Sequence, residues 1–327
     1  MKKRMLGKTG LMVSEVGFGA WAIGGDWGTV PPHQAASTLE AALDAGMTFV
    51  DTADVYGDGR SEKLVAQVRR NRADPFVIAT KAGRGLDPHV AAGYTLANIE
   101  AFVDRSREYL ETDTLDLLQL HCPPTPVFED SALFEALGEL QARGKVAQLG
   151  VSVETTEEAE KAIQHPIVST VQIIFNMFRH KPRERFFPMA AEKGVGIIAR
   201  VPLASGLLSG KMRSDMKFED SDHRRYNRRG EAFDVGETFS GVDFEEGLAA
   251  VEELREITPS GMTMAQFALK WVLMHPEVSV VIPGAKTPAQ ARENAAVSDL
   301  PALPDDVMMH VDKIYQKRIR PSVHHRW

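Results

Sequence analysis

Residues 115–151 give the clearest indication of the fold, and they begin with LDLLQLH (115–121). Its apolar residues follow one another with little alternation, which is typical of a parallel strand covered on both faces. A helical pattern follows at 131–143, is closed by Gly144, and leads into a second apolar run at 146–151. These segments predict one strand–helix–strand unit with parallel strands.

Similar apolar runs recur along the chain. We expect eight strands, at residues 16–21, 48–50, 76–80, 115–120, 146–151, 170–174, 196–200 and 278–282. The helical patterns between them are clearest at residues 33–45, 96–110 and 131–143. Between residues 51 and 200 the strand ends recur at intervals of roughly 30 residues, the length of one βα unit. Strands and helices that alternate in this way predict a closed (β/α)8 TIM barrel, with an open doubly wound sheet as the alternative.

The chain is expected to form a single barrel domain over residues 1–327. Residues 213–241 break the regular alternation of predicted strands and helices. They are charged, contain glycine and show little periodicity. We expect a long loop there on the catalytic face, where barrel enzymes vary their loops. A disordered surface insertion is the alternative. Residues 318–327 are expected to form a flexible tail.

The composition limits the class of protein. With 43% apolar residues the chain can fill a core, and its net charge of −7 argues against nucleic acid as a partner. The single cysteine, Cys122, excludes an internal disulfide and fits a reducing compartment. No secretion signal is evident, and no apolar run approaches the roughly 20 residues of a membrane helix. A cytoplasmic protein without membrane contact is therefore expected.

Polar side chains stand where three neighbouring strands end. Asp51 ends the second strand, Lys81 the third and His121 the fourth, while Tyr56 follows in the loop after Asp51. Since the carboxyl ends of barrel strands meet at one mouth, we expect these side chains to lie together. Taken singly, they have structural alternatives: an Asp51–Lys81 ion pair, a loop tyrosine and a rim histidine.

This set of side chains suits the reduction of a carbonyl group, in which hydride adds to carbon and a proton must reach oxygen. A phenol with a pKa of about 10 is a weak acid, but the ammonium of Lys81 would stabilise the phenolate of Tyr56 and lower that pKa. Asp51 would keep Lys81 charged, and a neutral His121 would donate a hydrogen bond to the carbonyl oxygen. A Schiff-base lysine, in another class of barrel enzyme, is an alternative role for Lys81.

The segment GMTFVDTADVYGDGRSEKL (46–64), together with IATK (78–81) and LDLLQLH (115–121), resembles the aldo-keto reductase family. The resemblance begins at LGKTG (6–10), which looks like the family's N-terminal β-hairpin, and extends to about Val297. It implies that the acid–base residue, Tyr56, belongs to a catalytic tetrad of Asp51, Tyr56, Lys81 and His121.

The resemblance implies NADPH as the cofactor, with NADH as an alternative, bound without a Rossmann fold. The implied contacts are Ser152, Gln172, Arg200, Pro202, Leu203, Gly206, Lys211, Gly284, Lys286, Gln290, Glu293 and Asn294. Ser152 and Gln172 would hold the carboxamide, although Val153 stands where asparagine is common. Lys286, near the start of a helix, would pair with a 2′-phosphate; a solvated lysine is its alternative role.

Arg200 stands where the family commonly has an aromatic residue that stacks on the nicotinamide. A guanidinium plane can also stack, and its charge would weaken the binding of cationic NADP+ relative to NADPH. The alternative is that Arg200 faces the substrate or a carboxylate.

The substrate is expected to contact Trp21, Trp27, Tyr56 and His121, with Asp26 in the same first loop. The late segment DHRRYNRR (222–229) favours a polar, polyhydroxylated or anionic substrate if it folds over the mouth, and a solvated face is the alternative. We expect no metal site, because the adjacent pair His324-His325 lacks further ligands.

The expected function is the NADPH-dependent reduction of an aldehyde or ketone, sugar-like carbonyls included, to an alcohol. The alternative is a cofactor-binding regulatory subunit with little turnover, similar to channel-associated members of the family. A small carbonyl or alcohol is the expected partner, and the sequence predicts no oligomeric state.

Overall fold

Eight parallel strands form one sheet that curls around a central axis. The computed structural model describes residues 1–25 and 27–327, so Asp26 lies outside the described residues. The strands are β3 (Phe18–Gly19), β4 (Phe49–Asp51), β5 (Val77–Ala82), β6 (Leu115–His121), β7 (Val146–Ser152), β8 (Val168–Ile174), β9 (Gly196–Arg200) and β10 (Val278–Val281). Each strand pairs in parallel with the next strand along the chain, from β3 to β10.

Backbone hydrogen bonds join the first strand to the last. The Val281 N–H donates to the Glu15 carbonyl at 3.0 Å, and the Gly17 N–H donates to the Val281 carbonyl at 2.8 Å. The Arg4 side chain supports this seam by donating to the carbonyls of Leu273, His275 and Val278. The sheet therefore closes, and the predicted (β/α)8 barrel is confirmed.

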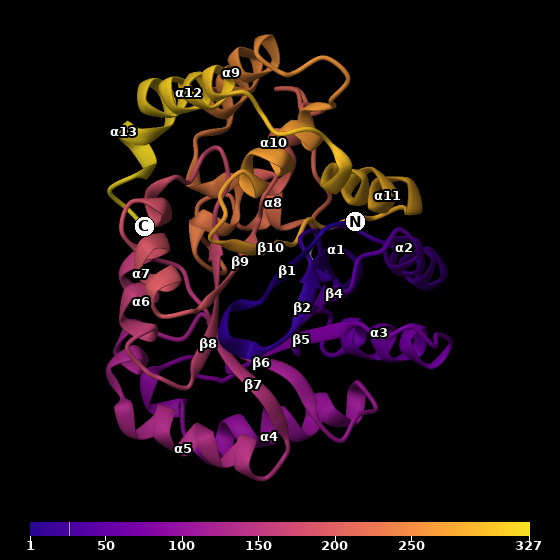
Figure 1. Ribbon diagram of the computed structural model, residues 1–327, viewed down its shortest axis with the longest axis vertical. Coiled ribbons are helices and arrows are strands. Elements are labelled where there is room, and N and C mark those ends of the chain that lie inside the picture. Colours follow the sequence, from indigo (N-terminus) through magenta and orange to yellow (C-terminus); the bar gives the residue numbers. More distant parts are fainter. Residues whose placement is uncertain (26) are drawn as a thin grey trace.

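Helices surround the strands on the outside (Figure 1). Those of the barrel ring and its connections are α2 (Pro32–Asp44), α3 (Arg60–Arg70), α4 (Leu96–Tyr109), α5 (Ser131–Ala142), α6 (Thr156–Ala162), α7 (Phe186–Glu192), α10 (Met264–Leu273) and α11 (Pro288–Ala296). Further helices are α1 (Trp21–Gly24), α8 (His223–Tyr226), α9 (Phe244–Glu256), α12 (Asp305–Ile314) and α13 (Arg320–Val323). The side chain of Thr155 caps α6, and that of Thr263 caps α10, each in a capping box.

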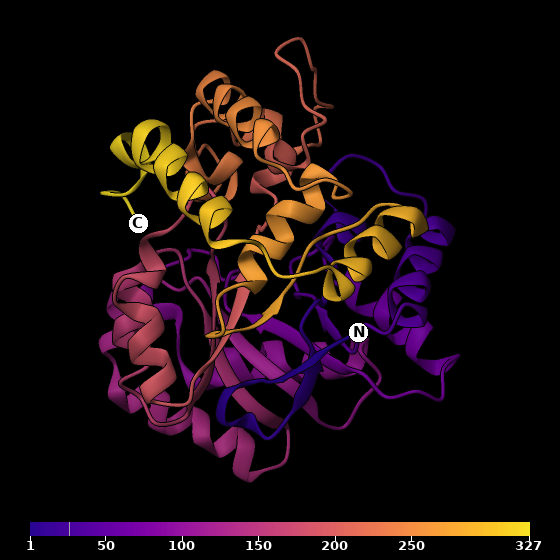
Figure 2. The same ribbon diagram turned by 45° about the horizontal axis from the view of Figure 1, so that its top comes forward.

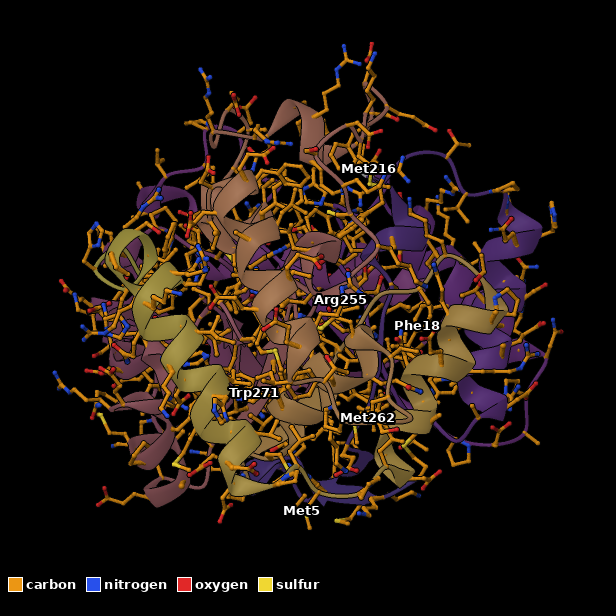
Figure 3. The ribbon with its side chains drawn as sticks, turned by 90° about the horizontal axis from the view of Figure 1, so that it is seen from above. Met5, Phe18, Met216, Arg255, Met262 and Trp271 are labelled. Carbon is orange, nitrogen blue, oxygen red and sulfur yellow. The ribbon has the colours of Figure 1, made fainter. Side chains whose placement is uncertain are left out.

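The helices present apolar side chains to the strands. Trp271 of α10 is fully buried, whereas Met216 of the segment 213–241 is exposed; both are labelled in the view from above (Figure 3). Among the described helices, none is both long and apolar enough to cross a bilayer.

The amino-terminal end of the barrel is plugged by a hairpin. Strands β1 (Lys3–Met5) and β2 (Met12–Ser14) pair antiparallel, which confirms the predicted hairpin. Leu6 and Val13 are fully buried against barrel residues that include Leu117. Gly7 has a φ of +52°, and a Cβ there would lie 2.1 Å from the Gly196 nitrogen, so only glycine fits this approach.

The first predicted strand, 16–21, is shorter in the structure. β3 covers Phe18–Gly19, and Trp21 begins the four-residue helix α1 instead. The turn of chain places the Trp21 side chain over the mouth of the barrel, where its ring stacks on Tyr56 with 6.0 Å between centroids.

The long segment 213–241 lies at the carboxyl end of the barrel and projects beyond the helices (Figure 2). It contains α8 and two 3-10 turns, Val235–Glu237 and Phe239–Gly241. An antiparallel bridge between Asp222 and Trp27 joins it to the first strand–helix loop. The segment thus forms one wall of the mouth.

Residues 318–327, which the sequence predicts to form a flexible tail, pack against the long loop through Trp327. It includes α13, and Trp327 is only 5% exposed. The indole Nε1 of Trp327 donates to Asp234 Oδ1 at 2.9 Å, and the Arg179 guanidinium lies 3.7 Å from the ring centroid. The burial of this large apolar face and its cation–π contact offset the fraying expected of a terminus.

Candidate active site

A cavity of about 620 Å³ opens at the carboxyl ends of the strands. Every site residue expected from the sequence lines this cavity, except for Lys81, which is buried directly behind it. The predicted residues along it are Trp21, Trp27, Asp51, Tyr56, His121, Ser152, Gln172, Arg200, Pro202, Leu203, Gly206, Lys211, Gly284, Lys286, Gln290, Glu293 and Asn294. The structure therefore brings the proposed catalytic and cofactor segments together around one space.

Lys81 contacts two other members of the predicted tetrad, Asp51 and Tyr56. Its Nζ lies 2.6 Å from Asp51 Oδ2 and 3.2 Å from the Tyr56 hydroxyl, and it donates to the Thr52 carbonyl at 2.9 Å. Lys81 is 1% exposed and Asp51 2%. An ammonium in this setting requires a fixed countercharge, and Asp51 supplies it.

Two amide side chains hold Asp51 from its other side. Gln172 Nε2 donates to Asp51 Oδ1 at 2.6 Å, and Gln119 Nε2 donates to the same oxygen at 3.2 Å. Gln172, expected at the cofactor carboxamide, thus contacts the carboxylate in this structure. The lysine and the two amides fix the position of the Asp51 carboxylate, so the direction of Lys81 is also fixed.

The electrostatics favour a charged lysine and a neutral tyrosine. Burial is the largest influence on the Lys81 pKa and lowers it, but Asp51 and Tyr56 together raise it above its usual value. Burial raises the pKa of Tyr56 to about 12, although Lys81 opposes the shift. Lys81 therefore lowers the Tyr56 pKa, as the sequence predicts. Burial raises this pKa by more, so the net shift is upward. Tyr56 carries its proton at neutral pH.

His121 is neutral at physiological pH. Burial, with help from the charges of Arg84 and Lys81, holds the pKa of His121 well below its usual value. Its Nδ1 is buried with no hydrogen-bond partner in the described part of the chain, and its ring meets that of Tyr56 edge-on at 6.1 Å. A neutral imidazole can donate a hydrogen bond at the mouth without carrying charge.

Close backbone contacts place Tyr56. A Cβ on Gly24 would lie 2.8 Å from the Tyr56 Cβ, and one on Gly57 would lie 2.3 Å from the Gly24 carbonyl. Gly57 also has a φ of +63°. Two glycines thus allow α1 to pack directly on the turn that carries Tyr56.

The far end of the cavity fits the phosphate-bearing end of a dinucleotide. The Thr287 side chain caps the nine-residue helix α11 at its cavity end. Lys286 and Arg224 both line the cavity there, and burial, followed by Arg224, lowers the pKa of Lys286. Lys286 Nζ contacts the Trp27 carbonyl. Lys286 beside a helix N-terminus forms a suitable place for phosphate. Arg224, which is paired with Asp222 at 2.5 Å, adds a partly neutralised cation to the same cavity, and the sequence had indicated only Lys286 for this role.

Other predicted cofactor residues are tied to the scaffold around this end. Lys286 N–H donates to Gln290 Oε1 at 2.8 Å, and Asn294 Nδ2 donates to the Gly284 carbonyl at 3.3 Å. Glu293 accepts a hydrogen bond from Thr263 Oγ1 at 2.8 Å. On the opposite wall, Gly206 has a φ of +99° in the turn after β9, a conformation that glycine adopts without strain.

Arg200 forms a buried ion pair. Its Nη1 lies 2.6 Å from Glu237 Oε2, and its Nη2 donates to the Val153 carbonyl at 2.9 Å. This agrees with the alternative that Arg200 faces a carboxylate. Burial raises the pKa of Glu237, but Arg200 and Arg84 outweigh this effect and lower it.

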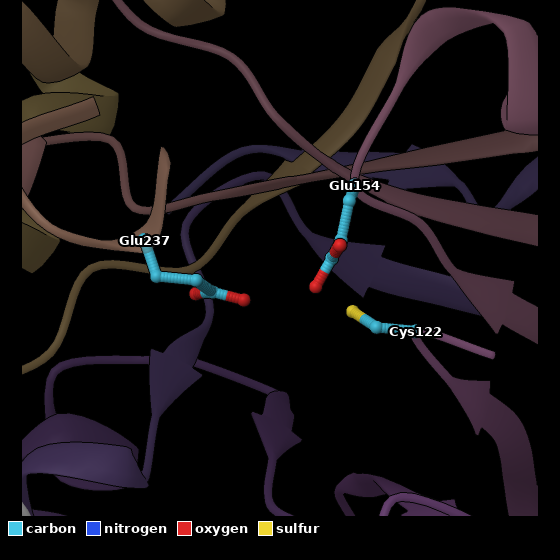
Figure 4. Close-up of side chains that lie close together, drawn as sticks. All are labelled: Cys122, Glu154 and Glu237. Atoms are coloured by element: carbon cyan, nitrogen blue, oxygen red, sulfur yellow. The ribbon is translucent and has the colours of Figure 1, made fainter. Parts of the chain in front are cut away.

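Cys122, Glu154 and Glu237 meet beside Arg200. Their ligand atoms all lie within 4.8 Å of one another, and Figure 4 shows both carboxylates directed toward the cysteine sulfur. The guanidinium of Arg84 lies 3.9 Å from Glu154 and 3.8 Å from Glu237. Since guanidinium groups already neutralise these carboxylates, the cluster is a poor cation site. Burial raises the pKa of the Cys122 thiol to about 11, which fits an inert filler.

Four residues at this site were not expected from the sequence: Gln119, Arg84, Glu154 and Glu237. Gln119 precedes His121 by two positions and therefore faces the same side of its strand, a signal that was available. Arg84 follows Lys81 by three positions, in the loop where catalytic groups collect. Glu237 stands in a segment without periodicity, and no local signal identifies it.

Most of the chain matches known proteins. The model of the aldo/keto reductase family matches residues 15–316. Aldo-keto reductase YhdN of Bacillus subtilis is 31% identical, over 89% of this chain and 86% of its own. A probable voltage-gated potassium channel subunit beta of Arabidopsis thaliana is 31% identical, over 97% of this chain and 98% of its own. The solved structure of a glycerol dehydrogenase from Gluconobacter oxydans has a TM-score of 0.78 and 28% identity, covering 97% of this chain and 96% of its own.

Proposed function

Because this chain belongs to the aldo/keto reductase family, we propose that it reduces an aldehyde or ketone to an alcohol, with NADPH as cofactor and Tyr56 as proton donor. The observation that carries the proposal is the 3.2 Å contact between the Tyr56 hydroxyl and Lys81 Nζ at the wall of the cavity. The reverse oxidation of an alcohol would use the same groups.

The proton comes from this chain. The Tyr56 hydroxyl gives its proton to the carbonyl oxygen as negative charge grows there, and the Lys81 ammonium stabilises the phenolate that remains. Asp51 keeps Lys81 protonated at a distance of 2.6 Å. This pairing also disfavours a Schiff-base role for Lys81, because a protonated amine is not a nucleophile.

His121 would orient the substrate. Its neutral ring donates to the carbonyl oxygen, and this hydrogen bond strengthens as the oxygen gains charge. Burial of the site makes each of these interactions stronger than it would be in water.

NADPH, when bound, supplies the hydride. We assign the phosphates to Lys286, Arg224 and the start of α11, and the nicotinamide end to the cavity wall at Ser152 and Arg200. NADH remains the alternative cofactor. Because the similar glycerol dehydrogenase acts on a polyol, we include sugar-like carbonyls among the substrates, and we propose a cytoplasmic location.

A regulatory subunit is the second candidate. The potassium channel subunit beta of Arabidopsis thaliana is similar to this chain over nearly its whole length. The contacts among Asp51, Lys81 and Tyr56 favour turnover, which a purely sensing protein does not need.

The test is NADPH consumption with a panel of carbonyl compounds, in the wild type and in Tyr56→Phe. We expect the variant to lose at least a hundredfold in kcat, the usual contribution of acid catalysis, and to bind NADPH as the wild type does. NADPH fluorescence measures the binding. Equal turnover by both proteins would remove Tyr56 from its role, and binding without turnover in the wild type would favour the regulatory subunit.

A further inference from the structure

We propose that Arg84, Glu154 and Glu237 form a subsite for hydroxyl groups, so that the preferred substrates carry a hydroxyl group next to the carbonyl. This inference rests on the proposed function and specifies its substrate class. It follows from three observations: the placement of Arg84, its lack of hydrogen bonds, and the balance of charge around it.

Arg84 is held at the cavity by a specific turn. Gly83 has a φ of +103°, and a Cβ there would lie 2.5 Å from the Tyr94 ring. The chain after β5 can therefore turn tightly against Tyr94 and direct Arg84 into the space beside His121. The guanidinium lines the cavity and lies 5.5 Å from the Phe233 ring centroid.

The donors of Arg84 form no hydrogen bond with the residues that the structure describes. Its carboxylate neighbours, at 3.9 Å and 3.8 Å, are too distant for hydrogen bonds. No hydrogen bond of its side chain is found among residues 1–25 and 27–327. Its side chain is 20% exposed, whereas that of Arg200 is 7% exposed and paired at 2.6 Å. Arg84 is thus the more accessible of the two cations of this wall, although Arg200 Nε also has no hydrogen-bond partner among the described residues.

The balance of charge decides which ligand. Two guanidinium groups, Arg84 and Arg200, face two acidic side chains, Glu237, which is ionised, and Glu154, whose raised pKa of about 7 leaves it partly ionised at neutral pH. An anion that approached Arg84 would meet the Glu237 carboxylate, and with rising pH that of Glu154 as well, and would gain little. A hydroxyl group both donates and accepts, so it can fit between the guanidinium and a carboxylate without altering the charge.

The rest of the wall suits the carbon side of the same molecule. Trp21 stacks on Tyr56, and Phe233 packs against Trp21 with 6.0 Å between centroids. These rings offer apolar faces for C–H groups, while the charged subsite receives the hydroxyls. The combination fits a short hydroxylated carbonyl compound better than a fully apolar or an anionic one.

The experiment compares three aldehydes with the NADPH-loaded enzyme: glyceraldehyde, propionaldehyde without hydroxyls, and anionic glyoxylate. We expect kcat/KM for glyceraldehyde to exceed that for propionaldehyde about tenfold or more, mainly through KM, because the site's polar groups stay unpaired with the deoxy compound. Arg84→Met is expected to reduce this ratio to near one. Arg143→Met, at the exposed residue that follows the last residue of α5, is the control and keeps the wild-type ratio.

A binding measurement separates this inference from the reaction. Enzyme loaded with NADPH cannot oxidise a polyol, so the Kd of xylitol measured by calorimetry reports the subsite alone. We expect Arg84→Met to raise this Kd about tenfold, and Glu154→Gln, which preserves side-chain size, to raise it less. The second variant keeps the test valid if the first does not fold.

The outcomes are distinguishable. A wild type that reduces propionaldehyde as well as glyceraldehyde, and binds xylitol no better than Arg84→Met does, overturns the subsite and leaves the reductase intact. A preference for glyoxylate that Arg84→Met abolishes assigns the site to anions instead and also overturns it. A wild type that reduces none of the aldehydes refutes the proposed function, while xylitol binding still decides the subsite.

Discussion

Arg200 at the end of β9 and Glu237 in the long loop form an ion pair in which both side chains are more than 90% buried. The pair ties a segment without regular structure to the barrel wall. We expect Glu237→Gln to lower the free energy of unfolding by about 3 kcal/mol, because it leaves the Arg200 charge buried without a partner. Urea unfolding measures this change. Asp215→Asn, which breaks an exposed pair in the same loop, is the control and should cause no measurable change.

Glu154 gives stability a specific pH dependence. Burial, together with the charges of Glu237 and Asp234, raises its pKa to about 7, while Arg84 and Arg200 oppose the shift. Between the ordinary carboxyl pKa and 7, the unfolded chain has lost this proton and the folded chain still holds it. The contribution of Glu154 to the free energy of unfolding therefore falls as pH rises through this window and is constant above it. Urea titrations at several pH values should show this fall in the wild type, and a shallower fall in Glu154→Gln. Parallel curves for the two proteins would contradict the assignment.

Gln119 donates a hydrogen bond to Asp51, the carboxylate that pairs with Lys81. We expect Gln119→Leu to lower kcat about tenfold, because Asp51 loses one of its amide donors and Lys81 is held less firmly. The Kd for NADPH should stay unchanged in a fluorescence titration. Gln164→Leu, at an exposed position, is the matched control. An increase in Kd without a change in kcat would place Gln119 at the cofactor instead.

Lys286 should determine the choice between the two cofactors. Lys286→Ala is expected to raise the Kd for NADPH about tenfold, roughly 1.4 kcal/mol, and to leave the Kd for NADH nearly unchanged. Lys217→Ala, an exposed lysine of the long loop, is the control. Equal losses for both cofactors would show that Lys286 does not distinguish the 2′-phosphate.

Trp327 anchors the loop that carries Glu237. Trp327→Ala is expected to lower the free energy of unfolding by about 3 kcal/mol, through lost burial and the lost contact with Arg179. It should also raise KM more than it lowers kcat, since the loop forms a wall of the cavity. Trp327→Phe keeps a ring over Arg179 and should restore part of the free energy of unfolding and part of the substrate affinity. His325→Ala, at an exposed position, should change neither the free energy of unfolding nor KM. A loss of kcat alone would contradict an anchoring role.

The regular parts of this protein could be predicted from its sequence because they follow local rules. Apolar runs such as residues 115–120 marked the strands, and the polar residue at the end of each run, such as His121, marked the mouth of the barrel. The strand order also followed, because each unit adds its strand beside the one before.

The remainder depends on contacts between distant segments. Three features lie where an irregular loop contacts another part of the protein: the ion pair of Glu237, the guanidinium of Arg84 and the packed ring of Trp327. The periodicity of the sequence does not indicate contacts of this kind. The tail shows the same limit. Its terminal position predicts fraying, and no local pattern indicates the contacts of Trp327 with Arg179 and Asp234.

The hydrogen bond between Glu15 and Val281, which closes the barrel, affects how the chain folds during its synthesis. During synthesis the first strand leaves the ribosome with one edge lacking its final neighbour, and that neighbour is made only when most of the chain has emerged. An open strand edge invites pairing with other chains. We therefore expect the nascent protein to depend on rapid completion or on chaperones, and a chain cut before β10 to aggregate rather than to fold as a smaller barrel.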